Sequence, residues 1–228
     1  NYIMKNSYSN IFTFNKKILK KTIKNLNIGK VIGLPTETVY GLGGNAYSKK
    51  SIQKIFKLKG RPKTNPLIIH YYSVNQAMDD VVLNIYFKKL YKKFCPGPIT
   101  FILKKKKNSK IHSLASAGLN TVGIRFPKHK VARSILKKIK FPLAMPSANK
   151  STGISPVSSK DVYAEFKRKI NLILDGGKCE IGIESTVIDL TNKPKILRPG
   201  IIDKIKIEKT LKLKINNINN YKKNRSPG

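Results

Sequence analysis

Short apolar runs alternate with amphipathic stretches along most of the sequence, and proline or glycine separates many of them. Residues 15–26 carry apolar side chains at helical spacing and are followed by Gly29, whereas residues 31–34 form a short apolar run that ends at Pro35. The first pattern predicts a helix with a glycine at its C-terminal end, and the second predicts a buried strand. Alternation of this kind predicts an α/β fold in which helices cover a sheet.

The same pattern continues through the C-terminal half of the chain. Short apolar runs predict further strands at residues 67–71, 99–103, 121–126, 143–145, 172–174 and 186–190. Helical spacing predicts helices at residues 48–58, 74–94, 129–139 and 161–170. Residues 35–44 are rich in turn formers and are expected to line a site. Several connections are too short for a helical crossover, so the sheet is predicted to be mixed in direction.

Length and composition favour one large domain. The chain has 228 residues, of which 40% are apolar, enough for a core of ordinary size. Beyond residue 200 the sequence is dominated by Lys, Ile and Asn, and it ends at Ser226-Pro227-Gly228. We therefore expect a folded domain over residues 1–200 and a basic tail over residues 201–228 that resembles the start of a linker.

The expected environment is a reducing one without a membrane. The apolar runs are far shorter than the roughly 20 residues of a membrane-spanning helix, and the first residues do not read as a secretory leader. Cys95 and Cys179 have no metal-ligand spacing and form no disulfide framework. We expect a soluble, cytoplasmic protein.

The net charge of +36 has two interpretations. Attraction to the phosphates of a nucleotide or an RNA is one, and a compositional bias towards Lys, Asn and Ile together is the other. The distribution of charge along the chain is more informative than the total, because no acid occurs between Asp80 and Asp161, where 18 basic residues lie. That stretch is expected to face an anion, although part of it can be plain solvated surface. Only six of the 47 basic residues are Arg, the side chain that matches phosphate and carboxylate in a bidentate manner.

Motifs that are absent narrow the chemistry. The sequence contains no G-x-x-x-x-G-K-[ST] loop, no G-x-G-x-x-G turn, no H-E-x-x-H and no paired-cysteine zinc motif, and it has only three histidines. Metal-centred and Ser-His-Asp mechanisms are therefore disfavoured, and no metal ligands are predicted. The remaining candidates are cations and short hydrogen-bonding side chains, which suit electrostatic clamping of a phosphoryl group. They are Lys59, Arg61, Arg125, Arg198, Thr36, Thr121, Ser147, Asn149 and Ser185.

Each short motif also has a plain structural interpretation when it is taken alone. Ser147-Ala148-Asn149 and Arg198-Pro199-Gly200 are typical of turns. Glu37 and Glu184 can help to hold a metal or can brace a turn. With so few acids in the chain, magnesium is expected to bind mainly through ATP phosphates.

Seven segments, taken in order, resemble the YrdC-like family of threonylcarbamoyl-AMP synthases. They are residues 35–42, 59–62 with 65–70, 96–100, 121–127, 146–149, 184–187 and 198–200. The resemblance implies a twisted open mixed sheet with flanking helices and a large basic concave cavity. It also implies that residues 1–200 form the catalytic domain, and that residues 201–228 lead into a smaller C-terminal domain as in the longer form of the family.

The activity that the resemblance implies is nucleotidyl transfer. L-threonine, bicarbonate and ATP would form threonylcarbamoyl-adenylate and diphosphate. A downstream threonylcarbamoyl transferase would then use the adenylate to modify the adenosine beside the anticodon of certain tRNAs, and direct tRNA contact is part of this expectation.

Motif matches assign the site residues. Lys59 and Arg61 with Ser147 and Asn149 would form the family's KxR…SxN signature, the first two as catalytic residues. The ATP-binding set is Lys59, Arg61, Asn65, Thr121, Ser147, Asn149, Ser155 and Arg198, and the threonine-binding set is Thr36, His70, Arg125 and Ser185.

Two alternatives remain open from the sequence. The chain can be a double-stranded RNA- or tRNA-binding module without catalysis, in which the acid-free basic stretch follows a phosphate backbone. Carbamoyl transfer in hydrogenase maturation shares the fold by resemblance, but it normally comes with paired-cysteine zinc motifs that this sequence lacks.

Overall fold

The computed structural model of the chain describes residues 8–151 and 153–215. Its strands are β1 (Ile11–Thr13), β2 (Ile32–Leu34), β3 (Gly41–Asn45), β4 (Ile68–His70), β5 (Ile99–Lys104), β6 (Thr121–Arg125), β7 (Leu143–Ala144), β8 (Ile173–Asp175), β9 (Thr186–Asp189) and β10 (Lys195–Arg198). Its α-helices are α1 (Lys16–Asn27), α2 (Lys49–Lys59), α3 (Val74–Ala77), α4 (Ile85–Phe94), α5 (Lys130–Lys138), α6 (Ser159–Phe166) and α7 (Lys204–Leu211). Two 3-10 helices are η1 (Ser113–Ser116) and η2 (Lys167–Lys169).

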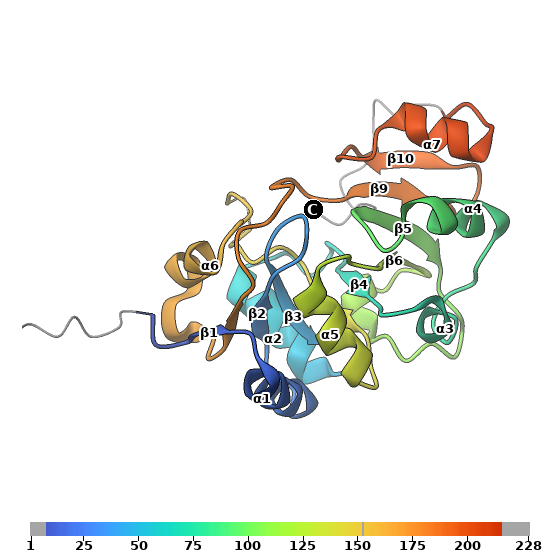
Figure 1. Cartoon of the computed structure of the whole chain (residues 1–228). Coiled ribbons are helices and arrows are strands. Elements are labelled where there is room, and N and C mark those ends of the chain that lie inside the picture. The colour runs from blue at the N-terminus through green and yellow to red at the C-terminus, as the bar shows by residue number, and fades with distance from the viewer. Residues whose placement is uncertain (1–7, 152, 216–228) are drawn as a thin grey trace, which may run out of the picture.

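In this part of the chain, ten strands form one mixed sheet in the order β1-β8-β2-β3-β7-β4-β6-β5-β9-β10 (Figure 1). The pairs β1–β8, β2–β8, β4–β6 and β5–β9 are parallel, and the other neighbours are antiparallel. The mixed α/β fold predicted from the sequence is therefore confirmed.

Different helices pack on the two faces of the sheet. Helices α1 and α5 pack together over β2, β7 and β8 (Figure 1). The remaining long helices contribute to a second core that contains residues of α2, α4, α6 and α7. Alternation along β8 separates the two cores, because Leu172 and Leu174 belong to the first and Ile173 to the second.

The first face continues past α5 onto β4 and β6, where the side chains become polar. On these strands Ile69 and Ile124 enter the second core. Their neighbours on the opposite face include His70 and Arg125, which are paired in the strand register and line a pocket. This uncovered part of the sheet is the floor on which the candidate site is built.

Residues 35–44, predicted to be turn-rich throughout, end in a strand. Gly41 and Gly43 in β3 need their lack of a side chain, because a Cβ would lie 2.4 Å from Met145 Cγ and 2.6 Å from Leu34 Cδ2, respectively. The close approach of neighbouring side chains thus explains why these positions are glycine, although in the sequence they suggested turns.

The sequence analysis did not predict strands β1 and β10.

The single helix predicted over residues 74–94 is wrong. The structure has two helices, α3 and α4, separated by residues 78–84. In this break the buried Asp80 accepts hydrogen bonds from the Tyr71 hydroxyl and the Lys110 backbone N–H, and Asn84 caps α4 through the Phe87 N–H. Hydrogen bonds between Asp80 and other segments hold the break after the first helix, and the local Asn84 cap starts the second.

The predicted boundary at residue 200 also needs correction. Beyond it the chain forms α7, which packs against α4, and Ile202, Ile207, Leu211 and Ile215 are buried in the second core. The folded domain therefore extends at least to Ile215, and the expected tail does not begin at 201. Ser226-Pro227-Gly228 lie outside the described residues, so the predicted linker stays a prediction.

None of the helices in the described ranges has both the length and the apolar character that crossing a bilayer requires.

Candidate active site

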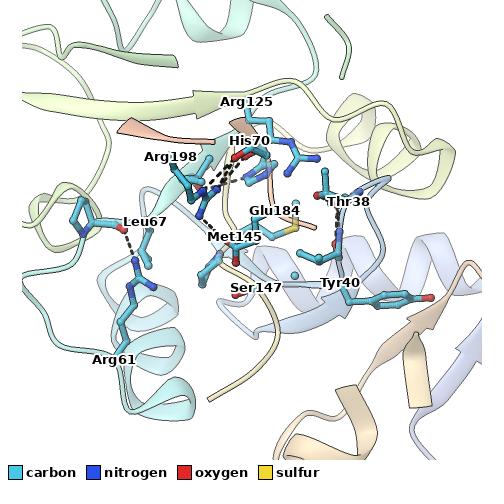
Figure 2. A pocket seen from close by; sticks show the side chains of 17 residues that line it. Thr38, Tyr40, Arg61, Leu67, His70, Arg125, Met145, Ser147, Glu184 and Arg198 are labelled. Atoms are coloured by element: carbon cyan, nitrogen blue, oxygen red, sulfur yellow. Dashed lines mark hydrogen bonds and ion pairs between the residues drawn. The ribbon is translucent and has the colours of Figure 1, made fainter. Parts of the chain in front are cut away.

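A pocket opens on the part of the sheet face that α1 and α5 leave uncovered, with about 470 Å³ of space including the part open to solvent. Figure 2 shows side chains from separate elements converging on it. The lining residues come from the β2–β3 connection, the segment after α2, the ends of β4, β6, β7 and β10, and the segment before β9. They are Thr36, Thr38, Val39, Tyr40, Gly41, Arg61, Pro66, Leu67, Ile68, His70, Arg125, Met145, Pro146, Ser147, Glu184, Ser185 and Arg198.

Arg125 is a buried cation at the C-terminal end of β6. Its Nη2 donates to Glu37 Oε1 at 2.7 Å. Its Nε is buried and has no hydrogen-bond partner among the described residues. Burial alone would raise the pKa of Glu37, but the charge and hydrogen bond of Arg125, with backbone N–H donors, lower it overall. Glu37 therefore stays ionised, and Arg125 keeps an unused donor beside the pocket.

His70 pairs with Arg125 in neighbouring strands and is also buried. Burial, followed by the charge of Arg125, lowers the pKa of His70 to about 3. Its Nδ1 lies 3.2 Å from the Ile68 carbonyl oxygen, which can only accept, so this hydrogen bond forms in the tautomer that carries the proton on Nδ1. His70 thus offers hydrogen bonding without a second positive charge next to Arg125.

Two hydroxyl side chains, Thr36 and Ser185, complete this side of the pocket. Thr36 Oγ1 donates to the Val39 carbonyl at 2.7 Å and accepts from the Thr38 N–H at 3.2 Å. Ser185 Oγ shares a 2.8 Å hydrogen bond with Thr100 Oγ1 on β5. Both hydroxyl groups are buried and held by fixed partners, which orients them before any ligand arrives.

Arg198, at the end of β10, forms a second ion pair in the pocket. Its Nη1 donates to Glu184 Oε2, and its Nε and Nη2 donate to the Ser185 carbonyl at 3.2 and 3.0 Å. The other oxygen of Glu184 accepts from Ser155 Oγ at 3.2 Å. Ser155 is not among the lining residues, but its hydroxyl contacts the lining residue Glu184.

Lys59 lies behind the pocket. Its Nζ donates to the carbonyl oxygens of Ser147 and Asn149 at 2.7 and 2.6 Å and to Asn149 Oδ1 at 3.3 Å. Burial, with a smaller contribution from Arg61, lowers the pKa of Lys59 to about 8. At pH 7 it is an ammonium that fixes the 147–149 segment, and of that segment Ser147 lines the pocket.

Arg61 follows Lys59 closely but points elsewhere. Between them Gly60 caps α2 with a left-handed φ of 59°, a conformation that favours glycine. Arg61 Nε donates to the Asn65 carbonyl at 3.1 Å, Nη2 donates to Asn65 Oδ1 and to the Pro66 carbonyl, and the side chain lines the pocket. Burial lowers the pKa of Arg61 to about 10, so it remains a cation at pH 7.

The structure therefore brings most of the predicted residues to one place. Thr36, Arg61, His70, Arg125, Ser147, Ser185 and Arg198 line the pocket. Four further predicted residues lie outside the lining but form hydrogen bonds to lining residues or to the 147–149 segment. They are Lys59, Asn65, Asn149 and Ser155. Thr121 lies at the far end of β6, on the same face as Arg125 but outside the lining.

Thr38 and Tyr40 line the pocket as part of the 35–44 segment that was expected to line a site, whereas Met145 was not predicted. Met145 is apolar, and only its neighbours in sequence point to the site. Glu184 was singled out for a metal or a brace, and the structure shows it paired with Arg198.

The protein provides little for direct metal binding. The described residues contain no group of three or more His, Cys, Asp or Glu side chains that could hold an ion. Glu184 is the one carboxylate among the lining residues, and both its oxygens already accept hydrogen bonds. This donor set fits a magnesium ion that arrives with phosphate ligands rather than a protein-built metal site.

Known proteins are similar in sequence to this chain. Residues 24–200 match the Sua5/YciO/YrdC family, described as telomere recombination. The threonylcarbamoyl-AMP synthase of Pyrococcus abyssi is 43% identical over 191 residues, which cover 80% of this chain and 54% of the relative. That of Bacillus subtilis is 41% identical over 186 residues, with 80% of this chain and 53% of the relative covered. The chain thus spans about half the length of these relatives.

The fold is shared as well. The crystal structure of P. abyssi Sua5 complexed with L-threonine matches with a TM-score of 0.87 and 36% identity, covering 96% of this chain and 66% of that chain. The family resemblance read from the seven sequence segments is confirmed by these findings. The chain belongs to the Sua5/YciO/YrdC family.

Proposed function

We propose that this chain carries the catalytic site of a threonylcarbamoyl-AMP synthase. The threonine nitrogen would lose a proton and bond to the carbon of CO2 derived from bicarbonate, giving a carbamate. A carbamate oxygen would then attack the α-phosphorus of ATP and break its bond to the bridging oxygen of the leaving diphosphate. The products are threonylcarbamoyl-adenylate, diphosphate and water.

The observation that carries this proposal is the placement of Arg125 and Arg61 in one pocket. A buried arginine with an unused donor suits an amino-acid carboxylate, and a second arginine suits a transferring phosphoryl group. Two relatives over 40% identical are named threonylcarbamoyl-AMP synthase, and a neighbour of the same fold binds L-threonine.

The threonine side of the pocket would use Thr36, His70, Arg125 and Ser185. Arg125 would bind the carboxylate through the donors that Glu37 leaves unused. Neutral His70 would accept a hydrogen bond from threonine without repelling its ammonium group. The hydroxyl groups of Thr36 and Ser185 would complete the orientation that a reaction of three substrates needs.

The nucleotide side would use Arg61, Ser147 and Arg198 directly. Arg61 would offset charge on the transferring phosphate. We infer that Lys59 acts as a positioning residue, because its ammonium is bonded to the backbone of the 147–149 segment and lies outside the lining. Of the remaining members of the predicted ATP-binding set, Asn65, Asn149 and Ser155 would support the residues that face the nucleotide. Thr121 lies outside the lining, and its role in ATP binding stays a prediction.

Magnesium would enter with ATP and supply charge neutralisation at the phosphates. The adenylate would pass to a threonylcarbamoyl transferase that modifies tRNA, and contact with tRNA through the basic surface is part of the proposal. Such a protein would work in the cytoplasm, where both free thiols, Cys95 and Cys179, remain reduced.

Substitution of Arg61 tests the proposal against the RNA-binding alternative. We expect Arg61→Ala to abolish diphosphate release that depends on threonine and bicarbonate, because it removes a cation from the pocket. Lys59→Ala should have the same effect by releasing the 147–149 segment. Exposed Arg168→Ala removes an equal charge elsewhere and should leave turnover unchanged.

The contrary results are equally clear. Near-normal turnover in a folded Arg61→Ala variant would sink the catalytic assignment. RNA binding without any threonine-dependent turnover in the unmodified chain would favour the alternative.

A further inference from the structure

Glu37 lies behind Arg125 and is not among the pocket-lining residues. Both its carboxylate oxygens are occupied. Oε1 accepts from Arg125 Nη2 at 2.7 Å, and Oε2 accepts from the backbone N–H groups of Lys128 and His129 at 2.9 and 3.4 Å. His129 is the N-cap of α5, so Glu37 connects the end of β6 to the start of the next helix.

The backbone around Glu37 is fixed to a third segment. Its carbonyl oxygen accepts from the Ile181 N–H at 3.0 Å, and the Thr38 carbonyl accepts from the Gly182 N–H at 2.9 Å. Because these bonds fix the main chain, the carboxylate has little freedom to follow Arg125 if the guanidinium moves. Arg125 is therefore held by a partner that is itself held at three points.

This arrangement divides the donors of Arg125 into two groups. Nη2 is bound by Glu37, whereas Nε is buried without a partner in the described ranges of the chain. A buried N–H without an acceptor is unfavourable, so an anion that supplies one binds at a position set by the guanidinium plane. The plane in turn is set by the bond to Glu37.

We propose that Glu37 is a positioning residue for amino-acid binding, which fixes the Arg125 guanidinium so that its remaining donors meet the substrate carboxylate. This inference rests on the proposed function and deepens it on the threonine side. Glu37 is neither a metal ligand nor a proton acceptor in this account, because both its oxygens are already engaged.

The direct test is threonine binding by calorimetry to the Glu37→Gln variant. Glutamine keeps the size but replaces one carboxylate oxygen by an NH2 donor, so either the Arg125 Nη2 donor or the Lys128 backbone N–H would face a donor instead of an acceptor. We expect the Kd for threonine to rise about 100-fold, the cost of a displacement of about 1 Å in a positioned group. The Kd for ATP should stay unchanged, and thermal unfolding should show a folded protein.

Matched variants control for charge and folding. Glu180→Gln removes the same charge from an exposed position outside the pocket and should leave both Kd values unchanged. Glu37→Asp retains the charge but shortens the reach by one methylene, and its loss of threonine affinity should be smaller than that of the glutamine variant.

Two readouts separate positioning from a general structural role. L-threoninol, which lacks the carboxylate, should bind the Glu37→Gln variant and the unmodified chain equally weakly, so that discrimination between threonine and threoninol falls about 100-fold with the threonine affinity. In an Arg125→Gln background, Glu37→Gln should cause no further loss of threonine affinity, because Glu37 acts through Arg125.

Each other outcome contradicts the inference. An unchanged threonine Kd in folded Glu37→Gln overturns it while the proposed function stands. Equal losses of threonine and ATP affinity would assign Glu37 a general structural role and also overturn it. If the unmodified chain binds no threonine, the proposed function fails and the inference with it.

Discussion

The pocket contains two arginine–glutamate pairs that differ in burial and in what surrounds them. In the Arg125–Glu37 pair the side chains are 5% and 4% exposed, and in the Arg198–Glu184 pair they are 19% and 30% exposed. Backbone donors at the start of α5 support the first acid, while one serine hydroxyl supports the second. Glu184 also lines the pocket, whereas Glu37 does not.

The difference suggests two ways of preparing a site for anions. On the proposed threonine side a rigid, desolvated cation would bind a small carboxylate, and the supporting acid would be shielded from the ligand. On the proposed nucleotide side the acid would share the pocket with the incoming phosphates, and its side chain is partly exposed to water. A cation that arrives with ATP would offset this carboxylate, which agrees with magnesium bound through phosphates.

The largest expected effect follows from Arg125→Ala. The substitution leaves the Glu37 carboxylate buried without its partner, and we expect the free energy of unfolding to fall by about 3 to 5 kcal/mol. Threonine-dependent turnover should be lost as well. Denaturant unfolding measures the first effect, with exposed Arg168→Ala as the control. A loss below about 1 kcal/mol, the value typical of a surface pair, would remove the contrast between the two pairs.

A smaller effect is expected for Arg198→Ala. Because this pair is partly exposed, the free energy of unfolding should fall by only about 1 kcal/mol. The KM for ATP should rise while the KM for threonine changes little, as steady-state diphosphate release would show. A selective rise in the KM for threonine would mean that the two sides of the pocket have been assigned the wrong way round.

The sequence predicted much of this site because its parts lie in short motifs. The cation-rich motifs around Arg61 and Arg198 stood out against a Lys-rich background, and the order of seven segments identified the family. The sequence could not distinguish the role of Lys59 from that of Arg61. In the structure the left-handed residue Gly60 lies between them, and Arg61 lines the pocket whereas Lys59 bonds to the 147–149 segment.

Long-range contacts explain why two features of the fold were predicted wrongly from the sequence. The break between α3 and α4 depends on Asp80, whose partners Tyr71 and Lys110 lie in other segments of the chain. Helix α7 carries apolar residues in a Lys-rich segment, and only its packing on α4 distinguishes it from a tail. Neither contact leaves a local pattern in the sequence.

Nucleotide affinity should depend on pH through the ionisation of Lys59. Burial lowers its pKa from 10.5 to about 8, so the folded protein loses the ammonium as pH rises through 8. Affinity for a non-hydrolysable ATP analogue should therefore decrease above pH 8, because the 147–149 segment loses its charged anchor.

Stability should respond to the same titration with the opposite sign. The unfolded chain keeps the Lys59 proton up to about pH 10.5, so between pH 8 and 10.5 the unfolded state binds more protons and the contribution of Lys59 to the unfolding free energy rises. Calorimetric titrations from pH 7 to pH 9 check the binding effect, and an affinity that is constant over this range would contradict it.

Salt should produce the smallest effect. Raising ionic strength from 0.1 to 1 M shortens the screening length from about 10 to about 3 Å. The destabilisation caused by Arg198→Ala should shrink, and that caused by Arg125→Ala should persist, because the Arg198–Glu184 pair is much more exposed to solvent than the Arg125–Glu37 pair. Equal salt sensitivity of the two variants in denaturant unfolding would count against the difference in burial.

The central claim is that one pocket gathers threonine, bicarbonate and ATP. Its most direct test is diphosphate release by the unmodified chain with all three present and with each omitted in turn. We expect release with the complete set and a fall to background when threonine or bicarbonate is left out. Diphosphate release that is indifferent to threonine, or no release from a folded chain that binds all three, would contradict it.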